Sequence, residues 1–168
     1  MPISMYHASV PVYTRQLGGL AGCLRKAQAH YAERRYDESA LLGYRLYPDM
    51  FHFTRQVQAS TDHARNGAAR LAGLEPPKYE DDEKSLAELI GRVEKTITFL
   101  NTITPEQVDG SEEKTITLKI RDRELSFKGL SFLLNQSMPN FYFHVTTAYN
   151  IMRHNGVEIG KRDFLGAS

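Results

Sequence analysis

The sequence predicts an all-α protein, a four-helix bundle with a small β-hairpin inserted before the last helix, in a single domain over residues 1–168. Four stretches repeat apolar residues at steps of three and four, which is typical of a helix with one buried face. One short stretch before the fourth helix alternates apolar and polar residues, as a half-buried strand does. A chain of 168 residues with 41% apolar content suits one compact domain with a single core.

The first helix is expected from Ser9 to about Arg34. Its apolar stripe consists of Tyr13, Leu17, Leu20, Leu24, Ala27 and Tyr31. Gly18 and Gly19 interrupt the exposed side of this pattern, and each lowers helix propensity by about 1 kcal/mol. This cost is best tolerated where another helix packs very close, so the glycine pair predicts a close helix contact.

The second long helix is expected to start within the stretch YPDMF, after a short helical turn through ESALL. Pro48 suits a first turn, and Asp49 suits the positive end of the helix dipole. The helix should end at Gly73, before Pro76 and Pro77. Its inward stripe consists of Phe53, Val57, Ser60, Ala64, Ala68 and Leu71. The following segment EPPKYEDDEK is interpreted as a polar, solvated connector.

The third helix should open at Ser85, because Ser85 and Glu88 have the S-x-x-E spacing of a capping box. Its core face consists of Leu86, Leu89, Ile90, Val93, Ile97 and Leu100. The stretch TITPEQ should end this helix and allow one further turn after Thr104.

The hairpin and the last helix complete the predicted bundle. Ile116, Leu118 and Ile120 alternate with polar residues, and Leu125 and Phe127 alternate again after the polar RDRE, although no Asn-Gly or Asp-Gly marks the turn. The last helix should begin at about Leu130, be kinked or restarted at Pro139, and end at Asn155-Gly156.

Composition excludes several classes of protein. The net charge is +1, from 21 basic and 20 acidic residues scattered along the chain, which leaves no basic surface for nucleic acid or an anionic membrane. No apolar stretch approaches the length of a membrane span. The single cysteine, Cys23, precludes an internal disulfide and is interpreted as a core residue. These features favour a cytoplasmic protein.

Histidines are the remaining candidates for a site, because the sequence contains no E-x-x-H, H-E-x-x-H, phosphate-binding loop, dinucleotide fingerprint or G-x-S-x-G. His63 lies at the edge of the inward stripe of the second helix. His144 shares a face of the last helix with Phe141, Ala148 and Ile151, and Asn140 lies one turn earlier. Taken singly, each histidine is more often a hydrogen-bonded core residue than a metal ligand.

Five stretches carry a resemblance that spans essentially the whole chain: ASVPVYTRQL, PDMFHFTRQVQ, DHARNGAARLAG, PNFYFHVTTAYNIMRHNG and DFLG. Together with four helices and a histidine on both the second and the last, they resemble the DinB-like (YfiT-type) superfamily. Within it they are similar to an uncharacterised bacterial branch known as a domain of unknown function. The resemblance implies the DinB-like bundle fold, and a fold by itself does not define a function.

The resemblance also implies where a metal would lie. In the superfamily, three histidines hold one divalent metal such as zinc or nickel, one from the second helix and two, spaced H-x-x-x-H, from the last. Alignment on MRHNG places His63 and His144 on the first and last ligands and Asn140 on the middle one. An amide oxygen is a poorer ligand than imidazole for these metals. Tyr142 or a water would then have to complete the shell.

Two functional hypotheses follow. In the first, the site has become a weak metal or polar site, and the protein is a non-enzymatic binding or dimeric module. In the second, His63 and His144 serve a metal- or thiol-dependent transferase or isomerase in stress or detoxification, since some superfamily members use low-molecular-weight thiols. A small-molecule ligand and a homodimer are expected, and a nucleic-acid partner is not.

Overall fold

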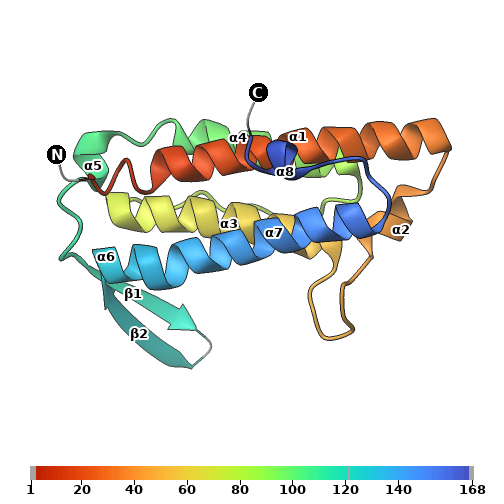
Figure 1. The fold of residues 1–168 in the computed structure, drawn as a ribbon. Helices are drawn as coiled ribbons and strands as arrows, with labels where there is room; N and C mark the ends of the chain where they lie inside the picture. Colours follow the sequence, from red (N-terminus) through yellow and green to blue (C-terminus); the bar gives the residue numbers. More distant parts are fainter. Residues whose placement is uncertain (1–2, 121, 167–168) are drawn as a thin grey trace.

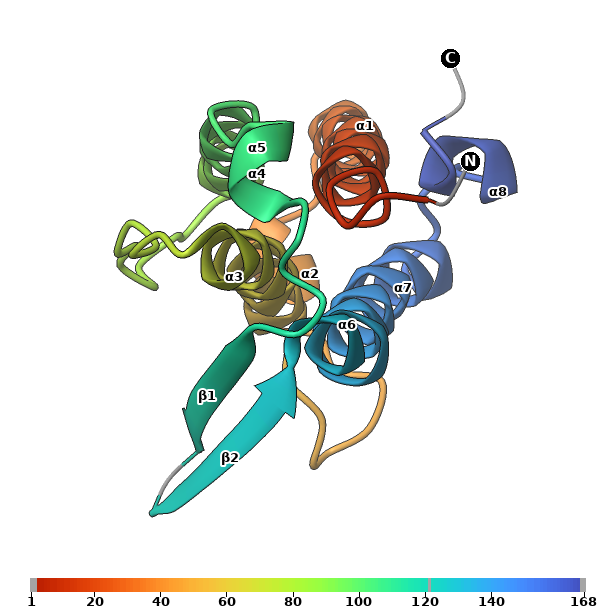
Figure 2. The same cartoon turned by 90° about the vertical axis from the view of Figure 1, so that its left-hand side faces the viewer.

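Four long helices form a bundle in the computed structural model, which describes residues 3–120 and 122–166 (Figure 1). They are α1 (Val10–Arg34), α3 (Phe53–Ala72), α4 (Leu86–Leu100) and α7 (Met138–His154). Viewed along the bundle, α1 lies beside α4 and α7, and α3 fills the opposite corner (Figure 2). The closest packing is between α1 and α4, between α3 and α7, and between α3 and α4. The predicted bundle with its hairpin is confirmed.

The core fills the space between these helices with apolar side chains. The largest fully buried residues are Tyr13, Phe53, Phe141, Leu17, Leu24, Leu41, Leu71, Leu86, Leu89, Leu100, Ile103 and Leu133. Cys23 is buried among them at 1% exposure, in agreement with its interpretation as a core residue. Within the described residues, no helix is both long and apolar enough to cross a membrane.

The close neighbour of the α1 glycines is the C-terminal helix α8 (Lys161–Phe164), and only one of the two glycines needs it. A Cβ atom on Gly19 would lie 2.6 Å from the backbone oxygen of Phe164, whereas a Cβ on Gly18 would meet nothing within 4 Å. Gln16 fastens the same segment, because its Nε2 donates to Phe164 O at 2.6 Å. The predicted close contact therefore exists, but with a short terminal helix rather than a helix of the bundle.

The start of α3 differs from the prediction, since the helix begins at Phe53 and not near Pro48. Between α2 (Glu38–Leu42) and α3, Pro48 lies in a turn in which Met50 N–H donates to Tyr47 O at 3.0 Å. Proline favours the second position of such turns as much as the first turn of a helix. The buried Phe53 decides the boundary, because its N–H donates to Tyr44 O at 2.8 Å.

The acidic connector is not simply solvated, which corrects the interpretation from sequence. Arg92 of α4, whose side chain is 2% exposed, forms ion pairs with Asp81 Oδ1 at 3.0 Å and Glu83 Oε1 at 2.9 Å. Its guanidinium also contacts Asp62 Oδ1 of α3 at 2.9 Å. A buried guanidinium needs several acceptors, and the acidic run supplies them. The connector is thereby held against α3 and α4.

The cap of α4 forms as the S-x-x-E spacing predicts, with a small shift. Ser85 Oγ accepts from Glu88 N–H at 3.2 Å, while the Glu88 carboxylate accepts from Lys84 N–H, one residue before the cap. After α4, helix α5 (Pro105–Val108) forms the expected further turn.

The hairpin projects from one end of the bundle (Figures 1 and 2). It pairs β1 (Thr115–Ile120) with β2 (Arg123–Lys128), and the register sets Ile116 opposite Phe127 and Leu118 opposite Leu125. The predicted alternation therefore places one apolar face towards the bundle, where Ile116 is buried. Arg121, within the predicted RDRE turn, lies outside the described residues.

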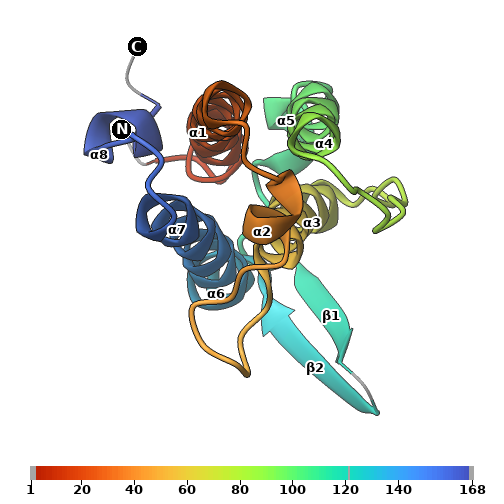
Figure 3. The ribbon, with the colours of Figure 1, turned by 90° about the vertical axis from the view of Figure 1, so that its right-hand side faces the viewer.

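The last helical run starts at α6 (Gly129–Phe132), passes through the π-helical turn η1 (Leu133–Ser137) and continues into α7. The π-turn ends at Ser137, two residues before Pro139, which has no N–H to donate and occupies the first turn of α7. The predicted restart at Pro139 therefore takes the form of a widened turn. At the other end of the bundle, α2 and the loop that follows it lie across the start of α3 (Figure 3).

Candidate functional site

Two histidines meet where α3 packs against α7. The ring centroids of His63 and His144 are 5.3 Å apart, and the ring planes are inclined by only 11°. Two imidazoles that bind one ion at about 2 Å through nitrogen would have centroids roughly 5 Å apart at a tetrahedral angle. The centroid spacing alone is therefore compatible with a ligand shared by the two rings, which are stacked.

Gln56, on α3, orients the ring of His144 through a hydrogen bond. His144 Nδ1 donates to Gln56 Oε1 at 2.7 Å, and Gln56 Nε2 donates to Phe51 O at 3.1 Å. Because an amide oxygen can only accept, Nδ1 carries the proton and Nε2 keeps a free lone pair. Metal-binding or proton-accepting histidines are commonly held in this way by a partner on the other nitrogen.

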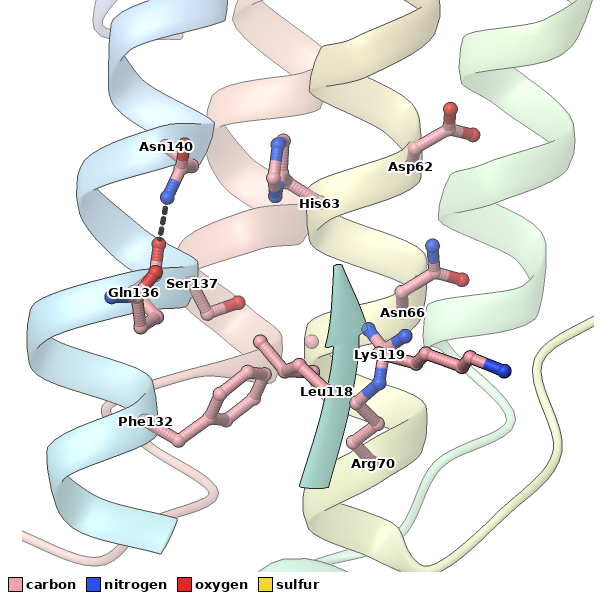
Figure 4. A pocket seen from close by; sticks show the side chains of 11 residues that line it. Asp62, His63, Asn66, Arg70, Leu118, Lys119, Phe132, Gln136, Ser137 and Asn140 are labelled. Carbon is pink, nitrogen blue, oxygen red and sulfur yellow. Dashed lines mark hydrogen bonds between the residues drawn. The ribbon is translucent and has the colours of Figure 1, made fainter. Parts of the chain in front are cut away.

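The π-turn and Pro139 position Asn140 at the beginning of α7. Asn140 Nδ2 donates to the backbone oxygen of Gln136 at 2.7 Å (Figure 4). This bond engages the amide nitrogen of Asn140, and Oδ1 remains available to accept a hydrogen bond or to bind a metal. In Figure 4, Asn140 from α7 and His63 from α3 point towards one another.

Aromatic rings cover the outer side of His144, which is 8% exposed. Phe51 lies nearly parallel to its ring, with centroids 6.0 Å apart, and Phe143 stands perpendicular to it at 5.2 Å. Both phenyl groups are themselves partly exposed, at 47% and 56%. The outer side of His144 is therefore shielded from water by an apolar rim.

Both imidazoles are kept neutral at neutral pH. Burial lowers the pKa of His144 to about 4, assisted by the neighbouring His63 and by Arg55. Burial also lowers the pKa of His63, and Arg70 and Arg55 act in the same direction, while Asp62 opposes them. A neutral imidazole is the form that accepts a proton or binds a metal.

A pocket of about 290 Å³ opens beside this pair, between α3, β1 and the run from α6 to α7 (Figure 4). It is lined by Asp62, His63, Asn66, Gly67, Arg70, Leu118, Lys119, Phe132, Gln136, Ser137 and Asn140. His63 and Asn140 thus face the pocket, whereas His144 lies behind them and is not part of its wall. Tyr142 also lies outside the wall and is 38% exposed, so the structure does not place it as a further ligand.

At the floor of the pocket, α1, α3 and the π-turn η1 come into close contact. Tyr13 Oη and Ser137 Oγ share a buried hydrogen bond of 2.7 Å. Ser137 occupies the space that a side chain at position 67 would need, so Gly67 is required there. Burial raises the pKa of the Tyr13 phenol strongly, which keeps it protonated.

The donor set does not fit a resident zinc or nickel centre. Within the described residues, no three side chains of the His, Cys, Asp and Glu types are grouped so that they could hold an ion. The site offers two imidazoles and one amide oxygen, and catalytic zinc sites have three strong protein ligands and an open position. No step of a reaction is therefore assigned to a bound metal.

Sequence reasoning identified His63, Asn140 and His144 but missed the groups that orient them. Gln56 lies seven residues before His63, and this spacing places both on one face of α3. The same periodicity could have indicated Gln56 as a partner. The Tyr13–Ser137 bond and the aromatic rim had no such local signal, because they join distant segments.

Comparisons with known proteins identify the family and the fold. The family model described as "Domain of unknown function (DUF1993)" matches residues 5–165. A crystal structure of a DinB family member protein from Shewanella denitrificans is 38% identical, with a TM-score of 0.86. The match covers 97% of this chain and 92% of that chain. None of the curated proteins matches significantly in sequence. The chain therefore belongs to the DUF1993 domain family, which has the DinB-like fold.

Proposed function

We propose that the protein is a binding module in which the metal site typical of DinB-like bundles has become a polar small-molecule site. The observation that carries this proposal is that the ring centroids of His63 and His144 lie 5.3 Å apart, while position 140, where the resemblance sets the middle ligand, is an asparagine. On this proposal the scaffold for three ligands is retained, and one strong ligand is missing.

The surroundings of the pair support this function. The bond from Gln56 fixes the tautomer of His144, and burial keeps both rings neutral, so that the pair can accept hydrogen bonds from a ligand. The adjoining pocket of about 290 Å³ is near the lower limit for small-molecule sites, which are typically about 300–1,000 Å³.

Calorimetric titration with zinc and nickel tests the proposal on the wild type and Asn140→His. The wild type should bind either ion weakly. The variant should bind far more tightly, by more than the roughly 10- to 100-fold that changes in the outer shell of a metal site produce, because it adds a direct ligand. Thr146→His is the matched control, since it adds an imidazole at an exposed position of the same helix with no histidine three or four residues away.

Each outcome has a definite meaning. Tight binding by the wild type would contradict the proposal and show that another group completes the shell. Equal gains in Asn140→His and Thr146→His would show that the added histidine acts at the surface. No gain in Asn140→His, with a lower melting temperature, would show that the pair is an ordinary buried contact.

A thiol-dependent transferase is the second candidate, and the access of the pocket to His63 favours it. A neutral imidazole at the wall of a pocket can remove the proton from a bound thiol and so activate it. Glutathione and cysteine with an electrophilic aryl halide provide the assay. Turnover that falls strongly in His63→Asn, but not in the control His154→Asn, would support an enzyme over a binding module.

A further inference from the structure

Arg70 lines the end of the pocket remote from His144 and has no partner in the described part of the chain. It is partly buried on α3, and no described carboxylate or carbonyl accepts a hydrogen bond from its guanidinium. Burial lowers its pKa, with Glu75 as the only opposing charge. By contrast, the guanidinium groups of Arg65 and Arg92 both form ion pairs with Asp62. A guanidinium that lines a pocket without an ion-pair or hydrogen-bond partner among the described residues leaves its donors free for an anionic ligand.

The other charges of the pocket leave Arg70 uncompensated. Asp62 is the one carboxylate of the pocket wall, and it is already bound by Arg55, Arg65 and Arg92. Lys119, on β1, adds a second positive charge at the exposed edge. The end of the pocket at Arg70 is therefore positive.

The distance to the histidine pair limits the size of a ligand. Arg70 follows His63 by seven residues, so both lie on one face of α3 about 10 Å apart along its axis. Helical side chains lean towards the N-terminus, and Figure 4 shows the Arg70 side chain reaching towards Asn66. Gly67 lies between and contributes no side chain to the pocket.

The remaining wall is neutral. The amides of Asn66, Gln136 and Asn140 provide hydrogen-bonding groups, and Leu118 and Phe132 provide apolar surface. Such a wall suits the short uncharged body of a molecule that carries a negative charge at one end.

We propose that this pocket binds a small organic oxyanion, with its carboxylate or phosphate group on the Arg70 guanidinium and its other end directed along α3 to His63 and Asn140. This inference rests on the proposed function in that it assigns the ligand class of the same site. The planar guanidinium can hold either oxyanion through two parallel hydrogen bonds. The volume of about 290 Å³ restricts the ligand to the size of a small metabolite.

Calorimetric titration with succinamate, which has one carboxylate and one amide, with its uncharged analogue succinamide and with inorganic phosphate tests the inference. A chelator is present so that metals play no part. Succinamate should bind the wild type, and Arg70→Met should weaken binding roughly 10- to 100-fold, because a hydrogen-bonded charge pair is lost. Arg162→Met is the matched control, an exposed arginine on α8, and should bind as the wild type does. Succinamide should bind to neither.

Phosphate distinguishes the two sources of the oxyanion. Tighter binding of phosphate than of succinamate, again lost in Arg70→Met, would assign a phosphate group. Equal succinamate affinity in Arg70→Met and the wild type, or equal affinity for succinamate and succinamide, would overturn the inference.

Folding of the variant is checked by its melting temperature. Arg70→Met should melt at or above the wild type, because it removes an uncompensated, partly buried charge. A clear fall in melting temperature would show that Arg70 serves the fold and would contradict the inference. The metal titrations of Asn140→His are independent, so either proposal can fail while the other stands.

Discussion

His144 should make the protein sensitive to acid. Its pKa is 6.5 in an unconstrained chain and about 4 in the fold, chiefly because burial disfavours the charged ring. Between these values the unfolded chain binds a proton that the native state does not, so the free energy of unfolding falls as the pH is lowered. The stability that neutral His144 allows is fully present above the unfolded value and is lost as the pH falls towards 4.

The size of this loss of stability follows from the difference between the two pKa values of His144. Each pKa unit corresponds to about 1.4 kcal/mol, so this group should lower the free energy of unfolding by about 3 kcal/mol between neutral pH and about pH 4. The lowered pKa of His63 acts in the same direction. This loss is a large part of the 5–15 kcal/mol, approximately, that stabilises an ordinary domain.

Urea denaturation followed by circular dichroism, repeated across this pH range, measures the effect. His144→Gln is the test variant, because its amide can still donate to Gln56 Oε1 but does not titrate. The wild type should lose about 3 kcal/mol more than this variant on acidification. His154→Gln, at the exposed end of α7, controls for the loss of an imidazole. A difference between wild type and His144→Gln that stays constant with pH would refute the reasoning.

Three further predictions concern the stability of the fold and its oligomeric state. Gly67→Ala should destabilise the protein by about 1–3 kcal/mol in thermal melts, because its methyl group would overlap Ser137. The control Gly91→Ala, in open space on α4, should be neutral or stabilising by up to about 1 kcal/mol. Arg92→Met should cost about 1–3 kcal/mol, because Glu83 loses its ion pair while Asp62 and Asp81 keep Arg55. Arg25→Met, which breaks an exposed pair, should change stability by less than about 1 kcal/mol in urea denaturation. The protein should sediment as a homodimer at micromolar concentration, and a monomer there would contradict the expectation taken from the superfamily.

Much of the fold could be predicted from sequence because each element carries its own local pattern. The stripe of α1, the Ser85 cap and the alternation of Ile116 and Leu118 depend on residues a few positions apart. Periodicity and capping act over one or two turns, so a single segment is enough to reveal them. The boundary at Pro48 failed because proline fits a turn and a helix start equally well, and only the burial of Phe53 distinguishes them.

The candidate site could be predicted only in part from local sequence patterns. The sequence by itself marked His63, Asn140 and His144, and the gap in the ligand pattern at Asn140. Only the tertiary structure decided that Gln56 fixes the tautomer of His144, and that Arg70 has no ion-pair or hydrogen-bond partner for its guanidinium among the described residues. Hydrogen bonding, charge pairing and desolvation depend on which side chains packing brings within a few ångströms, and local sequence patterns do not encode that proximity.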